Sequence, residues 1–354
     1  MTPDPKPERF VLSKKLAAVK QSLAEAVSDE FFVTHPEWVI RYGDRGRKHC
    51  TADVSFHMEF LAGAVEAGSP EAFGDYTRWT ARMLAARGIE AHALDENLDL
   101  LEKHLAAMLL PEEYRSVAGF LAHGRGAVNE SDPCALPQPR DQAIGTTREC
   151  FLAAILSGRR KAALRIIEDA LSEGHNQADL YVYVFSDALY RVGLLWEQNK
   201  ITVAQEHIAT SIAQYAIASI YARMTPDRIH RGNMVVTGVA GELHQIGANL
   251  VADSMEANGW TVRFLGTNLP HVSILAAVED MPADVLCISA TITPNLTAVA
   301  DLIRVVTYKM KGNAPRILLG GSAFRRVTSF DVGDVRPEVI PDLRSALSLL
   351  CDKV

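Results

Sequence analysis

Apolar residues recur every three or four positions over the first third of the chain, the spacing of helices with one buried face. Clear examples are LAAVKQSLAEAV, FHMEFLAGAV and LDLLEKHLAAMLL. Helix-breaking residues divide this region at Pro36, Pro70, Gly88 and Pro111. The pattern predicts an all-helical domain over residues 1–127, with about six helices and no strand.

A proline-rich stretch interrupts this pattern and favours an extended spacer, so we predict a linker over residues 128–145. Its prolines are Pro133, Pro137 and Pro139. Helical spacing returns over residues 146–228, where TTRE, beginning at Thr146, resembles a capping box. Helices of this length and number predict an antiparallel four-helix bundle that could act as a cap.

From residue 229 onward, short apolar runs alternate with helical segments. The runs are NMVVTGV, WTVRFLG, DVLCISAT and RILLGG, and each reads as a strand. Such alternation predicts a parallel, doubly wound sheet, so residues 229–354 form a Rossmann-like (flavodoxin-like) α/β domain. Sheets of this kind bind ligands at the carboxyl ends of their strands.

Composition narrows the class of protein. Of 354 residues, 36 are basic and 43 are acidic, for a net charge of −7, which argues against a nucleic-acid partner. The polar start MTPDPKPERF has no signal core, and no run approaches the roughly 20 apolar residues of a membrane span. The five cysteines are scattered, which argues against a disulfide framework or a zinc–thiolate site. We therefore expect a cytoplasmic protein.

The segment ELHQIG, directly after the first predicted strand, carries the main candidate for metal chemistry. A neutral imidazole is a good ligand for a transition metal, so His244 could bind cobalt from below. A carboxylate two residues away, Glu242, could fix the tautomer of that imidazole. Gly247 would let a cofactor approach the backbone closely. The alternative is an ordinary surface histidine at a helix N-terminus.

Small and hydroxylated residues end the next two strands and would leave a slot for a nucleotide tail; they are Ser289, Thr291, Gly320 and Gly321. Together with ELHQIG, this order of features resembles the cobalamin-binding domain of methionine synthase and the adenosylcobalamin mutases. The resemblance implies His244 as the lower ligand of cobalt and a tail lined by these four residues. Glu242 stands where that family has aspartate. A dinucleotide site is excluded because no Gly-x-Gly-x-x-Gly follows the first strand.

A tryptophan followed nine residues later by Glu-His lies in the predicted cap: Trp196, then Glu206 and His207. This spacing resembles light-sensing, adenosylcobalamin-binding transcriptional regulators. The resemblance implies that these side chains cover the upper face of the corrin and that a histidine beside the tryptophan can bind cobalt after light; His207 or water is the alternative upper ligand in this chain. Glu197 stands where those regulators have a histidine. The alternative is a core tryptophan beside a surface ion pair.

The N-terminal domain is rich in arginine, histidine and aromatic residues. Candidates for contact with a tetrapyrrole are Arg41, Arg45, His49, His57, Tyr76 and Trp79. Arginine suits the bidentate capture of propionates, and aromatic rings could stack on pyrroles. From the residues alone, a plain helical bundle is the stronger interpretation. The order of domains, however, resembles the photocobilins, which implies a globin-like module that binds biliverdin non-covalently.

The expected function is that of a light sensor and not an enzyme. Photolysis of the cobalt–carbon bond of adenosylcobalamin would change the packing of the cap, and a homodimer or an unknown effector protein would respond. Two alternatives stay open: a corrinoid methyl carrier that serves a methyltransferase, and a non-photoactive interaction module.

Overall fold

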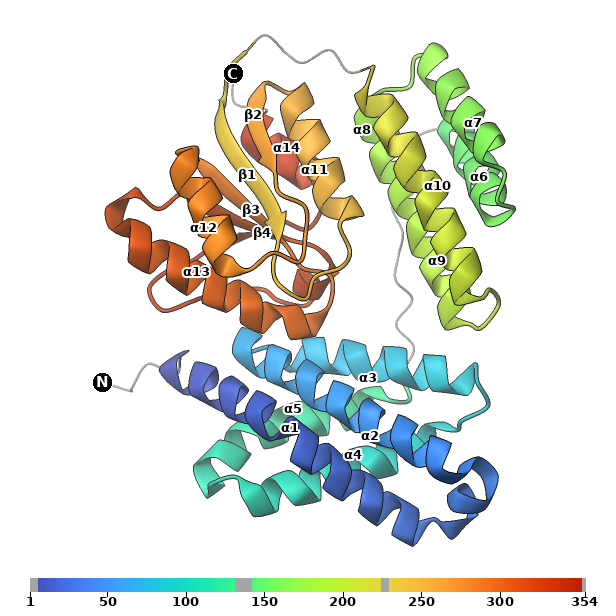
Figure 1. The fold of residues 1–354 in the computed structure, drawn as a ribbon, viewed down its shortest axis with the longest axis vertical. Coiled ribbons are helices and arrows are strands. Elements are labelled where there is room, and N and C mark those ends of the chain that lie inside the picture. Colours follow the sequence, from blue (N-terminus) through green and yellow to red (C-terminus); the bar gives the residue numbers. More distant parts are fainter. Residues whose placement is uncertain (1–5, 131–141, 224–228, 352–354) are drawn as a thin grey trace.

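The computed structural model describes residues 6–130, 142–223 and 229–351 (Figure 1). A helical N-terminal domain is followed by a helical cap and then by a domain built on a five-stranded parallel sheet. This arrangement confirms the predicted combination of a mostly helical N-terminal region with a Rossmann-like sheet. The globin-like character of the first domain stays a prediction.

The described part of the N-terminal domain has five labelled helices, of which the second joins two helices across a kink, so the structure agrees with the prediction of about six. The kink lies at Gly43, whose φ of 54° and ψ of −152° are not helical. The predicted breaks at Pro36, Pro70, Gly88 and Pro111 are confirmed. The helices are α1 (Lys6–Thr34), α2 (Pro36–Ala67), α3 (Pro70–Ala85), α4 (Ala91–Met108) and α5 (Pro111–Ala127).

The cap contains four helical rods, as the sequence predicts. The third rod is continuous from α8 through a π-helical segment, η1, into α9. The elements are α6 (Gln142–Leu156), α7 (Arg160–Ser172), α8 (Gln177–Asp179), η1 (Leu180–Ser186), α9 (Asp187–Glu197) and α10 (Val203–Tyr221). The predicted capping box at Thr146 is wrong. Thr146 lies inside α6, where its hydroxyl donates to the carbonyl of Gln142 at 3.0 Å. Part of the predicted linker, residues 131–141, lies outside the described residues.

The sheet has the strand order β2-β1-β3-β4-β5, and all neighbouring strands are parallel. The sequence did not predict β5 because only two residues pair. The strands are β1 (Gly232–Gly238), β2 (Trp260–Phe264), β3 (Val285–Ser289), β4 (Arg316–Gly320) and β5 (Glu338–Val339). The other elements are α11 (Ile246–Ala257), α12 (His271–Asp280), η2 (Thr293–Asn295), α13 (Leu296–Met310), η3 (Lys311–Asn313), η4 (Ser322–Phe324) and α14 (Leu343–Cys351).

Side chains of β1 alternate between two apolar cores, as expected of a sheet covered on both faces. Val235 packs with α12 and α13, whereas Met234 and Val236 pack with α11 and α14. In the strand register, Ser289 pairs with both Gly238 and Gly320. The carboxyl ends of β1, β3 and β4 therefore lie side by side, and the loops that carry the candidate residues leave from one edge.

The three parts pack against one another (Figure 1). Helices α9 and α10 lie between the other cap helices and the sheet domain, and the N-terminal domain lies beneath both. The hydroxyl of Tyr181 in the cap donates to Asp253 of α11 at 3.0 Å, and Arg344 of α14 donates to Asp179 at 2.6 Å. No helix in the described ranges combines the length and apolar character needed to cross a membrane.

Candidate metal and cofactor site

An acid–imidazole pair lies on the loop that leaves the central strand β1. Nδ1 of His244 donates to Oε1 of Glu242 at 2.7 Å, and the backbone N–H of His244 donates to the same oxygen at 2.8 Å. Glu242 is fully buried, whereas 59% of the His244 side chain is exposed. The hydrogen bond at Nδ1 fixes the tautomer and leaves Nε2 to bind a metal.

The second carboxylate oxygen of Glu242 is held from β3 and the turn that follows it. The backbone N–H of Thr291 donates to Oε2 at 2.6 Å, and Nδ2 of Asn295 donates to it at 2.9 Å. Burial opposes ionisation of Glu242, but these hydrogen bonds and those from His244 outweigh it and lower the pKa of the carboxyl. The hydrogen bond to Glu242 in turn raises the pKa of His244, against the effect of burial.

The neighbouring strand ends offer little side-chain bulk. Gly321 has a φ of 101°, and a Cβ there would lie 2.2 Å from the carbonyl oxygen of Ala290, so only glycine fits. A Cβ on Gly247 would meet nothing within 4 Å, which leaves space beside His244. Ser289 and Gly320 occupy paired positions at the same edge. The donor set and this open edge fit a planar metal cofactor with a tail.

The predicted residues of the cap lie in two different places, on α10 and at the end of α9. His207 is exposed on α10, and its Nδ1 pairs with the Glu206 carboxylate. The charge of Glu206 also contributes to the raised pKa of His244, which places α10 near the loop of β1. Trp196 lies at the end of α9, where the guanidinium of Arg87, in the turn after α3, stands 5.5 Å from its ring centroid.

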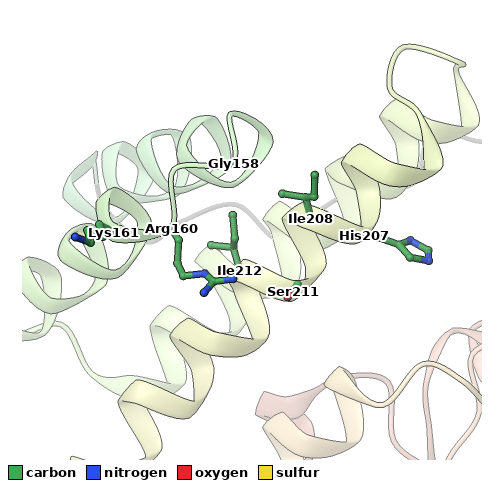
Figure 2. A pocket seen from close by; sticks show the side chains of 7 residues that line it. All are labelled: Gly158, Arg160, Lys161, His207, Ile208, Ser211 and Ile212. Atoms are coloured by element: carbon green, nitrogen blue, oxygen red, sulfur yellow. The ribbon is translucent and has the colours of Figure 1, made fainter.

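A cavity of about 540 Å³ lies within the cap itself, between the start of α7 and α10 (Figure 2). Its lining consists of Gly158, Arg160, Lys161, His207, Ile208, Ser211 and Ile212. The imidazole of His207 points away from Arg160 and Lys161 (Figure 2). None of these residues belongs to the sheet domain, so this cavity is not the space between the cap and His244.

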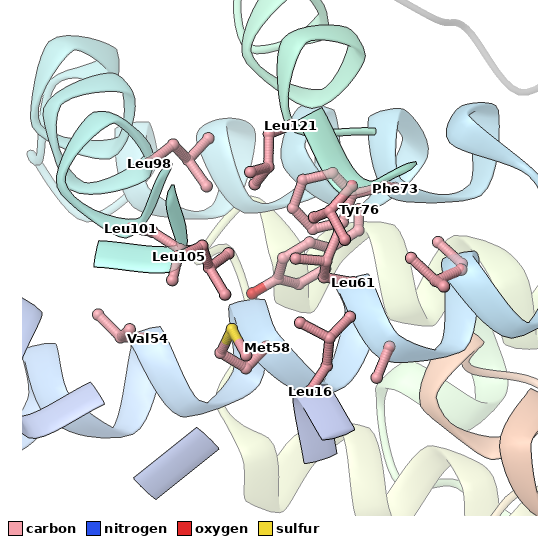
Figure 3. Packing of buried hydrophobic residues seen from close by; sticks show 14 of the residues in the cluster. Leu16, Val54, Met58, Leu61, Phe73, Tyr76, Leu98, Leu101, Leu105 and Leu121 are labelled. Carbon is pink, nitrogen blue, oxygen red and sulfur yellow. The ribbon is translucent and has the colours of Figure 1, made fainter. Parts of the chain in front are cut away.

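The N-terminal candidates do not converge on one site in this structure. His57 and Tyr76 are buried and joined by a 2.7 Å hydrogen bond, and the ring of Phe60 stacks on Tyr76 at 3.7 Å. Tyr76 lies within the packed apolar core of the domain (Figure 3). The ring of Trp79 lies 6.3 Å from that of Tyr76.

The basic candidates lie on the outside of α2. Arg41, Arg45 and His49 are all exposed. The guanidinium of Arg45 donates to His49 at 3.5 Å. Along a helix, the step from Arg45 to His57 is about 18 Å. A bilin that used both groups would have to reach from this surface into the core.

Comparison with known proteins agrees with the geometry at the sheet edge. Residues 232–335 match a family model described as a B12 binding domain, and residues 147–221 match a second model with the same description. This half of the chain is a cobalamin-binding unit. The predicted cobalamin cofactor is thereby confirmed, whereas its adenosyl form, biliverdin and light sensing stay predictions.

The relatives of the cobalamin-binding half are mostly corrinoid proteins. Dimethylamine corrinoid protein 3 of Methanosarcina acetivorans is 23% identical over 200 residues, which is 56% of this chain and 87% of that protein. Methionine synthase of Mycobacterium tuberculosis is 28% identical over 250 residues, 66% of this chain and 21% of the enzyme. The solved Methanosarcina barkeri monomethylamine corrinoid protein has a TM-score of 0.51 at 16% identity, covering 59% of this chain and 99% of its own, and this shows a shared fold.

Two groups of residues near the cobalamin-binding half were not predicted from the sequence. Asn295 holds Glu242, and the only signal for it is the segment TPN directly after the third strand. Arg82 donates to the buried carboxylate of Glu197 at 2.7 Å, next to the contact of Arg87 with Trp196. No sequence pattern points to this pairing, because the partners are more than 100 positions apart.

Proposed function

We propose that this chain holds cobalamin between the edge of the sheet and the cap, with His244 beneath the cobalt. The observation that supports this placement is the 2.7 Å hydrogen bond from Nδ1 of His244 to buried Glu242, which leaves Nε2 exposed for a metal. Ser289, Thr291 and the Gly320–Gly321 pair would hold the nucleotide tail, and Gly247 would leave space for the corrin.

The first use of the cofactor that we propose is light sensing. When bound, adenosylcobalamin supplies a cobalt–carbon bond that light breaks. The end of α9 carries Trp196, which we place over the cofactor. Arg82 of α3 and Arg87, in the turn after α3, hold that same end through Glu197 and Trp196. A shift of α9 must therefore change its contacts with the N-terminal domain, which is the basis of a two-state response.

The second candidate is a corrinoid methyl carrier, and the comparisons favour it over light sensing. The relatives are named as corrinoid proteins and methionine synthase, and the first of them is covered over 87% of its length. A carrier would use His244 in the same way, and its cap would open to a partner methyltransferase.

Biliverdin in residues 1–127 is the least direct part of the proposal. The exposed arginines Arg41 and Arg45 could bind its propionates, and His57, Tyr76 and Trp79 could contact its rings after a rearrangement of the packed core. We further propose that the chain forms a homodimer and passes the light signal to an effector protein that is not yet identified.

The decisive test is a structural response to light, because free adenosylcobalamin is itself photolabile. Backbone hydrogen exchange over residues 187–203 would be compared in the dark and after green light, in protein loaded with adenosylcobalamin. Light sensing predicts faster exchange after illumination, with no such change in protein loaded with hydroxocobalamin. Equal exchange before and after light would leave the carrier as the better proposal.

A further inference from the structure

A glycine of the N-terminal domain lies directly on a turn of the sheet domain. Gly63 is buried in α2, and a Cβ at this position would lie 2.1 Å from the carbonyl oxygen of Thr293 and 3.1 Å from the nitrogen of Pro294. Both atoms belong to the backbone of η2 and cannot turn aside as a side chain could. The backbones of α2 and η2 are therefore in direct contact, and only glycine permits it.

The same turn carries one of the groups that hold the carboxylate beneath His244. Asn295, the last residue of η2, is 7% exposed, and its Nδ2 donates to Oε2 of Glu242 at 2.9 Å. Thr291, just before the turn, donates its N–H to the same oxygen at 2.6 Å. A displacement of η2 must therefore move the Glu242 carboxylate and, through it, the imidazole of His244.

Residues that follow Gly63 hold the end of α2 and the turn after it against the sheet domain. The buried carboxylate of Glu66 pairs with Arg304 of α13, and the Ser69 hydroxyl donates to the carbonyl of Arg326 at 2.8 Å. Ala67 of α2 packs within the apolar core of the sheet domain. The end of α2 is thus fixed to α13 and η2, so a change in the packing of α2 acts on the turn.

We propose that the N-terminal domain sets how firmly His244 is held, through the contact of Gly63 with η2 and with Asn295 as a positioning residue for Glu242. This inference rests on the proposed role of His244 as the cobalt ligand. A ligand or partner that moves α2 would change the axial coordination of cobalt without contacting the corrin.

The test uses the full chain and three variants. Gly63→Ala displaces η2, Asn295→Ala removes the positioning amide, and Gly119→Ala is the matched control, because a Cβ at this helical glycine meets nothing within 4 Å. Without cofactor, the amide resonances of Thr291 and His244 report the contact with Glu242. With cob(II)alamin, the nitrogen splitting in the electron paramagnetic resonance spectrum reports axial coordination by histidine.

We expect both amide resonances to shift in Gly63→Ala and Asn295→Ala and to stay in place in Gly119→Ala. We expect cobalamin affinity to fall about 10-fold in the first two variants, as for other groups that orient a metal ligand. If Gly63→Ala does not fold, Glu66→Gln, which weakens the adjoining contact, should shift the same resonances by a smaller amount.

The outcomes separate this inference from the proposed function. If wild-type protein shows no splitting from a histidine nitrogen, the proposed role of His244 is wrong. If wild type shows it but Gly63→Ala behaves like Gly119→Ala, control by the N-terminal domain is overturned. An unchanged Asn295→Ala variant would overturn the positioning role.

Discussion

Replacing Glu242 by alanine tests the geometry of the site without any cofactor. Its carboxylate is fully buried and accepts hydrogen bonds from Thr291 and Asn295. It also accepts hydrogen bonds from the backbone N–H and the ring Nδ1 of His244. In Glu242→Ala, the exposed His244 ring can turn to water. The N–H groups of Thr291 and His244 and the amide of Asn295 would lose their acceptor. Each buried donor left unpaired costs about 1–3 kcal/mol, so for three donors we expect a loss of at least about 3 kcal/mol in the free energy of unfolding.

The conservative variant Glu242→Gln separates charge from shape. The glutamine keeps one acceptor oxygen, but its NH₂ group faces the N–H donors that the second carboxylate oxygen accepted from. The stability of Glu242→Gln should therefore lie between that of wild type and that of Glu242→Ala. Cobalamin affinity should fall about 10- to 100-fold in Glu242→Ala, because His244 is no longer oriented.

The assay is urea unfolding of the cofactor-free chain, followed by titration with cobalamin. Glu256→Ala is a suitable control, since its carboxylate accepts an exposed hydrogen bond from Tyr221, at 3.0 Å. If Glu242→Ala is as stable as this control and binds cobalamin with wild-type affinity, the hydrogen bonds to Glu242 do not support the site, and the reasoning is refuted.

Three further predictions concern other parts of the molecule. Burial lowers the pKa of His57 to about 4, below the about 6.5 of an unfolded chain. Between about pH 4 and pH 6.5, His57 is therefore protonated in the unfolded chain but neutral in the folded protein. We expect His57 to contribute a loss of roughly 3 kcal/mol in stability as pH drops from 6.5 to 4, and this contribution to be absent in His57→Gln in urea unfolding. Gly321→Ala should lose about 2 kcal/mol or more in thermal unfolding because of its positive φ and the contact with Ala290, whereas Gly247→Ala should not. After green light, the absorption spectrum of the adenosylcobalamin-loaded His207→Ala variant should differ from that of wild type, and identical spectra would exclude His207 as upper ligand.

Much of the fold follows from local patterns in the sequence. Alternating strands and helices predicted the parallel sheet, and the position of ELHQIG after β1 placed Glu242 and His244 at its edge. Helix-breaking residues such as Pro36 and Pro70 predicted most ends of the N-terminal helices.

Contacts between distant segments could not be predicted. Gly63 looks like any small residue in a helix until α2 is packed against η2, and Asn295 gains its role only through the loop of β1. The pairing of Arg82 with Glu197 depends on how the cap and the N-terminal domain sit together. His57 and Tyr76 were interpreted as ligand contacts, yet in the structure they satisfy each other in a packed core, and which role they have in a pigment-bound protein stays a prediction.

The central claim is that His244 binds cobalt, and one spectroscopic measurement tests it most directly. Cob(II)alamin would be bound to protein whose histidines carry ¹⁵N, and the nitrogen splitting in the electron paramagnetic resonance spectrum would be compared with that of unlabelled protein. We predict that the label changes the splitting in wild type and in His207→Ala, and that the splitting from histidine is lost in His244→Ala. A splitting in His244→Ala that still responds to the histidine label would contradict the account.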